Sequence, residues 1–115
     1  MKRFPAGLLG VDRGSVLLFS DFQDGGPMWT GEGAREARKH VRFSTPFAEQ
    51  PTVILGISLW DMDRRTNLRA DLTAETVLRE GFEIVFRTWA DTRVARIRVD
   101  WTALGPLPDP DLWAL

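Results

Sequence analysis

The chain has 115 residues, of which 43% are hydrophobic, so it has the length of one domain and enough apolar side chains for a two-layer core. With 15 basic and 16 acidic residues, its formal net charge of -1 lacks the basic excess that a nucleic-acid partner requires. The absence of cysteine excludes disulfides, thiolate metal sites and cysteine nucleophiles, so stability must come from packing or assembly.

Residues 1–13 show no clear hydrophobic period, and we expect them to form an N-terminal arm. Asp12 and Arg13 interrupt the apolar run of this arm before it reaches the length of a signal-peptide core. No segment approaches the roughly 20 apolar residues of a membrane span. We therefore expect a soluble protein without a signal peptide and without membrane insertion. Release from the cell and incorporation into an extracellular particle both stay open.

Short apolar runs bounded by turn residues predict the first strands. The run that follows Gly14 favours a first strand, and a second is expected from Ala37 to Phe43. The glycine-rich segment between them predicts a long loop, in which Trp29 is expected to form an aromatic lid over the end of the fold. The most hydrophobic run, Pro51 to Trp60, predicts a central strand in which Gly56 marks a bulge or a close backbone approach.

The stretch from Gly81 to Trp101 predicts two strands joined by a tight turn that carries Trp89. Its apolar residues recur at a spacing of two and define one buried face: Phe82, Ile84, Phe86, Ile97, Val99 and Trp101. Its charged residues define the opposite face: Glu83, Arg87, Arg96, Arg98 and Asp100. We therefore expect a hairpin whose charged face meets either water or another copy of the chain. For Trp89, a core plug and a binding platform both stay open.

One further strand is expected between Asn67 and Val77, where alternation places Arg69 on the polar side. Together these runs predict an all-β fold, a six-stranded antiparallel β-sandwich over residues 14–105, with no convincing helix. Residues 106–115 are rich in proline and predict a tail. Its apolar side chains are expected to dock onto the sandwich or onto a neighbouring copy: Leu112, Trp113 and Leu115.

The sequence offers little for catalysis or metal binding. His40 is the single histidine and lies in a basic run, where a solvated side chain is expected and no Ser-His-Asp triad can be assembled. Asp61 and Asp63 have no third acidic residue at the spacing of a calcium loop, so we expect them to solvate a loop. No nucleophile stands beside a base, and no acid pair has glycosidase spacing. We expect a protein that is not an enzyme, without metal or cofactor.

Three segments resemble the H-type lectin domain of snail agglutinins and slime-mould discoidins: FSTPFAEQPTVILGISLWD, NLRADLTAE and GFEIVFRTWADTRVARIRVDW. The shared features are the "PF" entry to the central strand, "NLR", and "GF" leading to "TWADT" and a final tryptophan, and they extend over about residues 29–105. The resemblance implies a β-sandwich that assembles as a trimer or a dimer of trimers. It also implies metal-independent binding of galactose or N-acetylgalactosamine in crevices between protomers.

The resemblance also assigns roles to individual residues. The family's sugar-binding arginine falls on Arg69, its stacking tryptophan on Trp89, and its acidic ligand on or near Glu32, with Gly31 beside it. Asp91 of the "TWADT" element completes the candidate set. These groups suit a pyranose, because a carboxylate accepts from adjacent hydroxyls, a guanidinium donates in a fixed fork, and an indole stacks on the apolar sugar face.

Two departures from the family pattern affect the expected sugar preference. Ala90 stands where snail agglutinins have a histidine, and Ala95 where they have a tyrosine, so preference or affinity is expected to differ. From the residues alone, Arg69 also has a competing role as the partner of Asp71 or Glu83 in a cross-strand ion pair.

The sequence therefore supports two functions. The first is a multivalent lectin for galactose or N-acetylgalactosamine glycans on cell surfaces, in which oligomerisation compensates for weak single sites. The second is a structural β-sandwich module of a larger particle, such as a spike or tail appendage, with no intrinsic sugar binding. The charged face of the expected hairpin would supply the contacts between copies: Arg87, Arg96 and Arg98 against Glu83 and Asp100.

Overall fold

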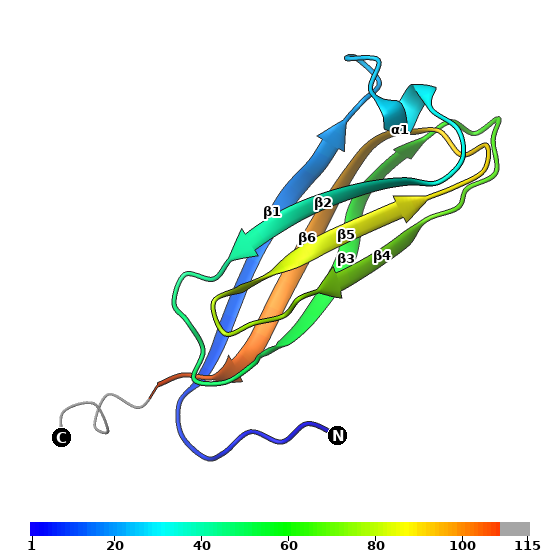
Figure 1. Ribbon diagram of the computed structural model, residues 1–115. Coiled ribbons are helices and arrows are strands. Elements are labelled where there is room, and N and C mark those ends of the chain that lie inside the picture. Colours follow the sequence, from blue (N-terminus) through cyan, green and yellow to red (C-terminus); the bar gives the residue numbers. More distant parts are fainter. Residues whose placement is uncertain (109–115) are drawn as a thin grey trace.

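The computed structural model describes residues 1–108 and consists of two antiparallel sheets packed face to face (Figure 1). Its elements in chain order are β1 (Leu9–Ser20), α1 (Pro27–Thr30), β2 (Arg35–Arg42), β3 (Thr52–Met62), β4 (Asp71–Glu75), β5 (Gly81–Thr88) and β6 (Val94–Pro106). One sheet has the strand order β1-β6-β3 and the other β2-β5-β4. The expected all-β sandwich of six antiparallel strands is confirmed, and the short helix α1 is an addition to it.

The core lies between the two sheets and follows the period of two in the central strands. The residues of β5 and β6 that were predicted to be buried point into the space between the two sheets. Phe82, Ile84 and Ile97 have no exposed surface. Phe82 also packs against Trp101, with ring centroids 5.6 Å apart. Gly14 of β1 pairs with Trp101 of β6. A Cβ placed on Gly14 would lie 2.8 Å from the indole nitrogen of Trp101, so the indole fits only beside a glycine.

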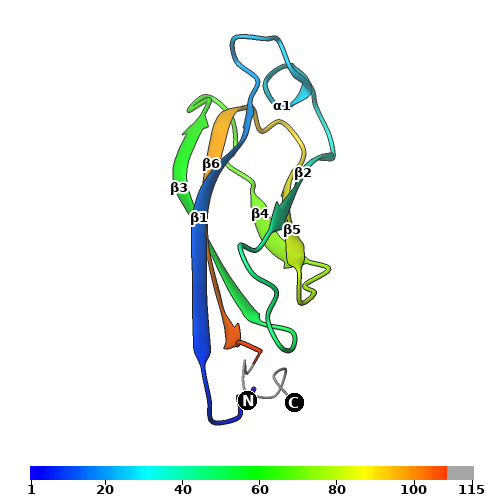
Figure 2. The ribbon, with the colours of Figure 1, turned by 90° about the vertical axis from the view of Figure 1, so that its left-hand side faces the viewer.

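The predicted hairpin over residues 81–101 is wrong. β5 pairs with β2 and β4, whereas β6 pairs with β1 and β3, so the two strands belong to different sheets. Figure 2 views the sandwich from the side and shows β5 and β6 in opposite layers. A period of two reveals which side of a strand is buried, but the pattern is the same for strands that pair edge to edge and for strands that face each other.

The charged face of that expected hairpin is consequently divided between two surfaces. Glu83 and Arg87 lie on the outer face of β2-β5-β4, where both form ion pairs within the chain. Arg96, Arg98 and Asp100 lie on the outer face of β1-β6-β3. The five residues therefore cannot act as one interface.

β1 begins at Leu9, well before the strand expected from Gly14. The sequence pattern did not predict the early part of this strand, because its apolar residues point outward: Leu9 is 57% and Val11 is 58% exposed. The inward positions hold Gly10 and Gly14, which sequence patterns associate with loops. Gly56 of β3 pairs regularly with Asp100 and faces open space, so the bulge or close approach expected at this glycine is wrong, and the register with β6 first shifts between Ile57 and Leu59.

The ends of the described chain complete the sandwich. The backbone N–H of Leu107 donates to the carbonyl of Leu8 at 2.9 Å, which continues the β1–β6 edge beyond the strands. The expected docking of Leu112, Trp113 and Leu115 lies outside the described residues. Within residues 1–108, no helix has the length and apolar composition needed to cross a membrane.

Candidate functional site

All five residues predicted to bind sugar lie in three connections at the α1 end of the sandwich (Figure 1). The connection between α1 and β2 contains Gly31 and Glu32, and the one between β3 and β4 contains Arg69. The connection between β5 and β6 contains Trp89 and Asp91. The fold therefore gathers at one end residues that are far apart in the sequence.

Trp89 directly follows β5 and is 42% exposed, which excludes its role as a core plug. Its position is fixed by the neighbouring turn rather than by burial of the indole. Ala90 adopts a left-handed backbone conformation with φ of 58°, and its carbonyl accepts a hydrogen bond from the backbone N–H of Gly33 at 2.9 Å. The guanidinium of Arg35 donates to the same carbonyl at 3.3 Å. The Trp89 turn is thereby joined to the glycine loop.

Arg69 precedes β4 instead of lying within a strand, so its predicted place on the polar side of a strand is wrong. Two buried threonine hydroxyls hold its backbone. Thr88 donates to the carbonyl of Arg69 at 2.6 Å, and the N–H of Arg69 donates to Thr92 at 3.1 Å. The Thr92 hydroxyl also donates to the carbonyl of Asn67. The Arg69 loop and the Trp89 turn therefore form one hydrogen-bonded unit.

The Arg69 side chain is exposed and forms no ion pair within residues 1–108. Its competing partners are engaged elsewhere, because Asp71 lies 3.9 Å from Arg87 and Glu83 lies 2.9 Å from Arg38. The guanidinium of Arg69 is thus available to a ligand, whereas a cross-strand ion pair with Asp71 or Glu83 would have occupied it.

Asp91 shapes the same unit. Its carboxylate accepts hydrogen bonds from the backbone N–H and the side-chain amide of Asn67, each at 3.2 Å. The backbone hydrogen bond of Asn67 is the main cause of a pKa below the ordinary value for this carboxyl, followed by the Asn67 side chain and, more weakly, the charge of Arg69. Asp91 is therefore ionised at neutral pH and holds the loop that presents Arg69.

Two glycines position Glu32. The N–H of Gly31 donates to the carbonyl of Pro27 at 2.8 Å, and a Cβ at Gly31 would lie 2.5 Å from that oxygen, so no larger residue fits without a shift. Gly33 adopts a positive φ of 75°, which favours glycine. Glu32 is exposed to solvent at this turn, between the two glycines. The expected aromatic lid, Trp29, is partly buried in the adjoining α1.

Asp61 and Asp63, predicted together to solvate a loop, have separate roles. Asp61 pairs with Arg96 at 3.0 Å on the outer face of the sheet. Asp63 is 7% exposed, so the prediction that it solvates a loop is wrong. The side chain of Arg65, and then its backbone N–H, lower the pKa of Asp63 to about 2. Within residues 1–108, no group of three or more His, Asp or Glu residues gathers as metal ligands would.

A shallow hollow of about 290 Å³ adjoins Trp89 on the outer face of β2-β5-β4. Its lining consists of Ala34, Arg35, Glu36, Arg87, Thr88 and Trp89. Only Trp89 among these was predicted from the sequence as a site residue. Glu36 and Arg87 face each other in the β2–β5 register, and the distance from Arg87 Nε to Glu36 Oε1 is 3.0 Å. This neighbourhood follows from the pairing of β2 with β5, which no local sequence pattern indicated.

The two three-stranded sheets, with exposed aromatic, basic and acidic side chains at one end, define an antiparallel β-sandwich with a candidate binding end. The chain belongs to the H-type lectin domain family, whose model matches residues 38–104. The resemblance found in the sequence is therefore confirmed.

The relatives include the product of one open reading frame and several discoidins. A protein of Fuscovulum blasticum named ATP synthase subunits region ORF 7 is 53% identical over 107 residues, which cover 93% of both chains. Two discoidin-1 sequences of Dictyostelium discoideum are each 35% identical over 75 residues, which cover 64% of this chain and 30% of each discoidin. The structure of wild-type discoidin II from the same organism has a TM-score of 0.73 at 24% identity, covering 84% of this chain and 36% of that one. This chain thus corresponds to about a third of a discoidin, and the structural likeness shows the fold.

Proposed function

We propose that this protein is a metal-independent lectin that binds glycans of the galactose or N-acetylgalactosamine type. The observation that supports this best is the exposure of Trp89 on a turn that hydrogen bonds tie to both the Arg69 loop and the Glu32 loop. Trp89 would stack on the apolar face of the sugar, while Arg69 donates to its hydroxyls and Glu32 accepts from them. Gly31 and Asp91 would fix the loops that present these groups. No catalytic step belongs to this proposal.

The rigidity of the site favours binding. Loops already held by Thr88 and Thr92 lose little conformational freedom when a ligand arrives, so less of the interaction energy is spent on ordering. The site remains open to water, and we expect affinities of about a millimolar to high micromolar per site, or roughly 4 to 6 kcal/mol.

A trimer, alone or as a dimer of trimers, is the second part of the proposal, because several weak sites on one assembly can raise the effective affinity by about 10² or more. The outer face of β1-β6-β3 is the surface best suited to contact between copies. It exposes several large apolar side chains that a monomer in water would rarely gather: Leu9 57%, Val11 58%, Leu17 50% and Ile54 57%. The sugar would then bind where one protomer adjoins the next.

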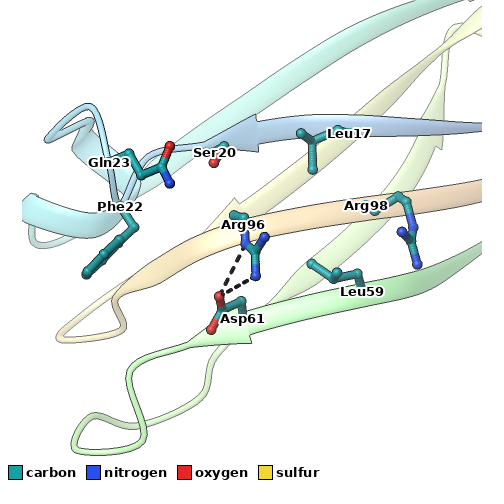
Figure 3. Close-up of a pocket in the computed structure, with 8 residues that line it drawn as sticks. All are labelled: Leu17, Ser20, Phe22, Gln23, Leu59, Asp61, Arg96 and Arg98. Carbon is teal, nitrogen blue, oxygen red and sulfur yellow. Dashed lines mark hydrogen bonds and ion pairs between the residues drawn. The ribbon is translucent and has the colours of Figure 1, made fainter.

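Figure 3 shows the α1 end of this face. A hollow of about 580 Å³ lies there, in which Leu17 and Leu59 flank Arg98, and Arg96 pairs with Asp61. Of the charged residues expected between copies, Arg96 and Arg98 therefore remain in this proposal, together with Asp100 in the neighbouring row. The apolar and charged character of the face also supports the alternative function, a structural module of a larger particle without sugar binding.

A glycan array probed with the purified protein, followed by calorimetry with N-acetylgalactosamine, separates the two functions. For the lectin we expect binding by the native chain and its loss in Trp89→Ala and Arg69→Ala, with the oligomer intact by ultracentrifugation. Leu78→Ala and Arg64→Ala are matched controls, since both residues are exposed, lie outside the candidate set and belong to neither β1, β6 nor β3. Absence of any bound glycan at high protein concentration would favour the structural module.

A further inference from the structure

The hollow beside Trp89 contains polar groups that the proposed site does not use. Trp89 forms one wall, and Glu36 and Arg87 from neighbouring strands lie along the outer face of the sheet. Its volume of about 290 Å³ is close to the lower end of ligand pockets and is suited to a single saccharide. The methyl group of Ala34 adds a small apolar contact at its margin. The hollow is therefore a second place where a sugar could rest against the same indole.

Ion pairs hold Glu36 and Arg87 in fixed positions. Arg87 lies 3.0 Å from Glu36 and 2.8 Å from Glu75, while Arg38 lies 3.1 Å from Glu36. The side chains of Arg87 and Glu36 nevertheless remain 37% and 40% exposed, so both can still contact a ligand. A ligand would meet groups that are already ordered, which lowers the entropic cost of binding.

The charge of this surface selects the kind of ligand. Two guanidinium groups meet four carboxylates in the network: Arg38 and Arg87 against Glu36, Asp71, Glu75 and Glu83. Arg35, the remaining cation of the hollow, donates to three backbone carbonyls of the adjoining loops: Met28, Gly33 and Ala90. Arg35 keeps its charge, so three guanidinium groups face four carboxylates, and the surface has a negative excess of one charge that favours hydroxyl donors over anions.

We infer that this hollow is a second subsite for a neutral saccharide, the one linked to the terminal sugar bound by Arg69 and Glu32. Glu36 accepts a hydrogen bond from a hydroxyl of this saccharide, and Arg87 donates to a neighbouring oxygen. The existing ion pair does not prevent this, because a sugar hydroxyl both donates and accepts and each carboxylate oxygen has more than one lone pair. The inference rests on the proposed lectin function and adds to it a preference for neutral, extended glycans.

Calorimetry with three ligands tests the subsite: N-acetylgalactosamine, a neutral disaccharide with terminal N-acetylgalactosamine linked to galactose, and the same disaccharide with sialic acid on its inner residue. We expect the native protein to bind the neutral disaccharide about tenfold more tightly than the monosaccharide, as one or two added hydrogen bonds would give. The sialylated form should lose this gain, because its carboxylate would approach the acidic network.

Two variants assign the gain to the hollow. Ala34→Leu fills it from an exposed loop position, and Glu36→Ala removes the hydrogen-bond acceptor. Both should bind N-acetylgalactosamine as the native protein does and lose the tenfold gain. Glu83→Ala is the matched control, since Glu83 belongs to the same network but not to the lining, and it should keep the gain.

The outcomes separate this inference from the function on which it rests. If the native protein binds the monosaccharide and the disaccharide equally well, or if both variants keep the gain, the subsite is refuted while the lectin function stands. If neither sugar binds, the lectin function and the subsite both fail. Thermal unfolding of each variant confirms that any loss does not come from misfolding.

Discussion

Replacement of Thr92 by valine tests whether buried hydroxyls hold the candidate site together. Thr92 has no exposed surface, accepts a hydrogen bond from the N–H of Arg69 at 3.1 Å, and donates one to the carbonyl of Asn67. Valine has nearly the same shape but cannot form either bond. Since each bond contributes about 0.5 to 1.5 kcal/mol, and water can replace part of it in the exposed loop, we expect the free energy of unfolding to fall by about 1 to 2 kcal/mol.

The loss of these two hydrogen bonds should also weaken ligand binding. Because the loop that presents Arg69 would no longer be fixed, Thr92→Val should weaken binding of N-acetylgalactosamine by several-fold. Urea denaturation measures the stability, and calorimetry measures the affinity. Thr45→Val is the matched control: Thr45 is exposed, and its change should stay within about 0.5 kcal/mol of the native protein. If Thr92→Val were as stable as that control, the hydroxyl would not hold the loop, and the reasoning would be refuted.

The described contacts make three further predictions. Gly14→Ala should lower the free energy of unfolding in urea by about 1 to 3 kcal/mol, because the new methyl group would meet the facing indole, whereas Gly56→Ala, which points into open space, should cost nothing. Asp63 has its pKa lowered to about 2 from 3.8, so stability should be complete above about pH 4 and fall as the pH drops toward 2; Asp63→Asn should remove this pH dependence of unfolding, and an unchanged profile would contradict it. Ile54→Glu should dissociate the proposed oligomer in ultracentrifugation and reduce binding to a glycan surface by about 100-fold, whereas Leu78→Glu, with similar exposure, should leave both unchanged.

The candidate site was only partly predictable. Arg69, Trp89 and Glu32 came from a resemblance in short motifs, and the structure places them in three connections at one end of the sandwich. Their roles in binding stay predictions. The neighbourhood of Glu36 and Arg87 had no local signal, since it exists only because β2 pairs with β5 in one particular register. A face of alternating charges looks the same whether it is solvated or lines a ligand site.

The sequence by itself determined which side of β5 and β6 is buried, as in Phe82, Ile84 and Ile97, because alternation of apolar residues is a local property of the chain. Only the tertiary structure decided that β5 and β6 lie in opposite sheets, that Leu9 starts a strand, and that the Trp89 indole is exposed. These features depend on contacts between distant residues. The energy that selects one strand pairing over another comes from the whole core, and no single segment contains it.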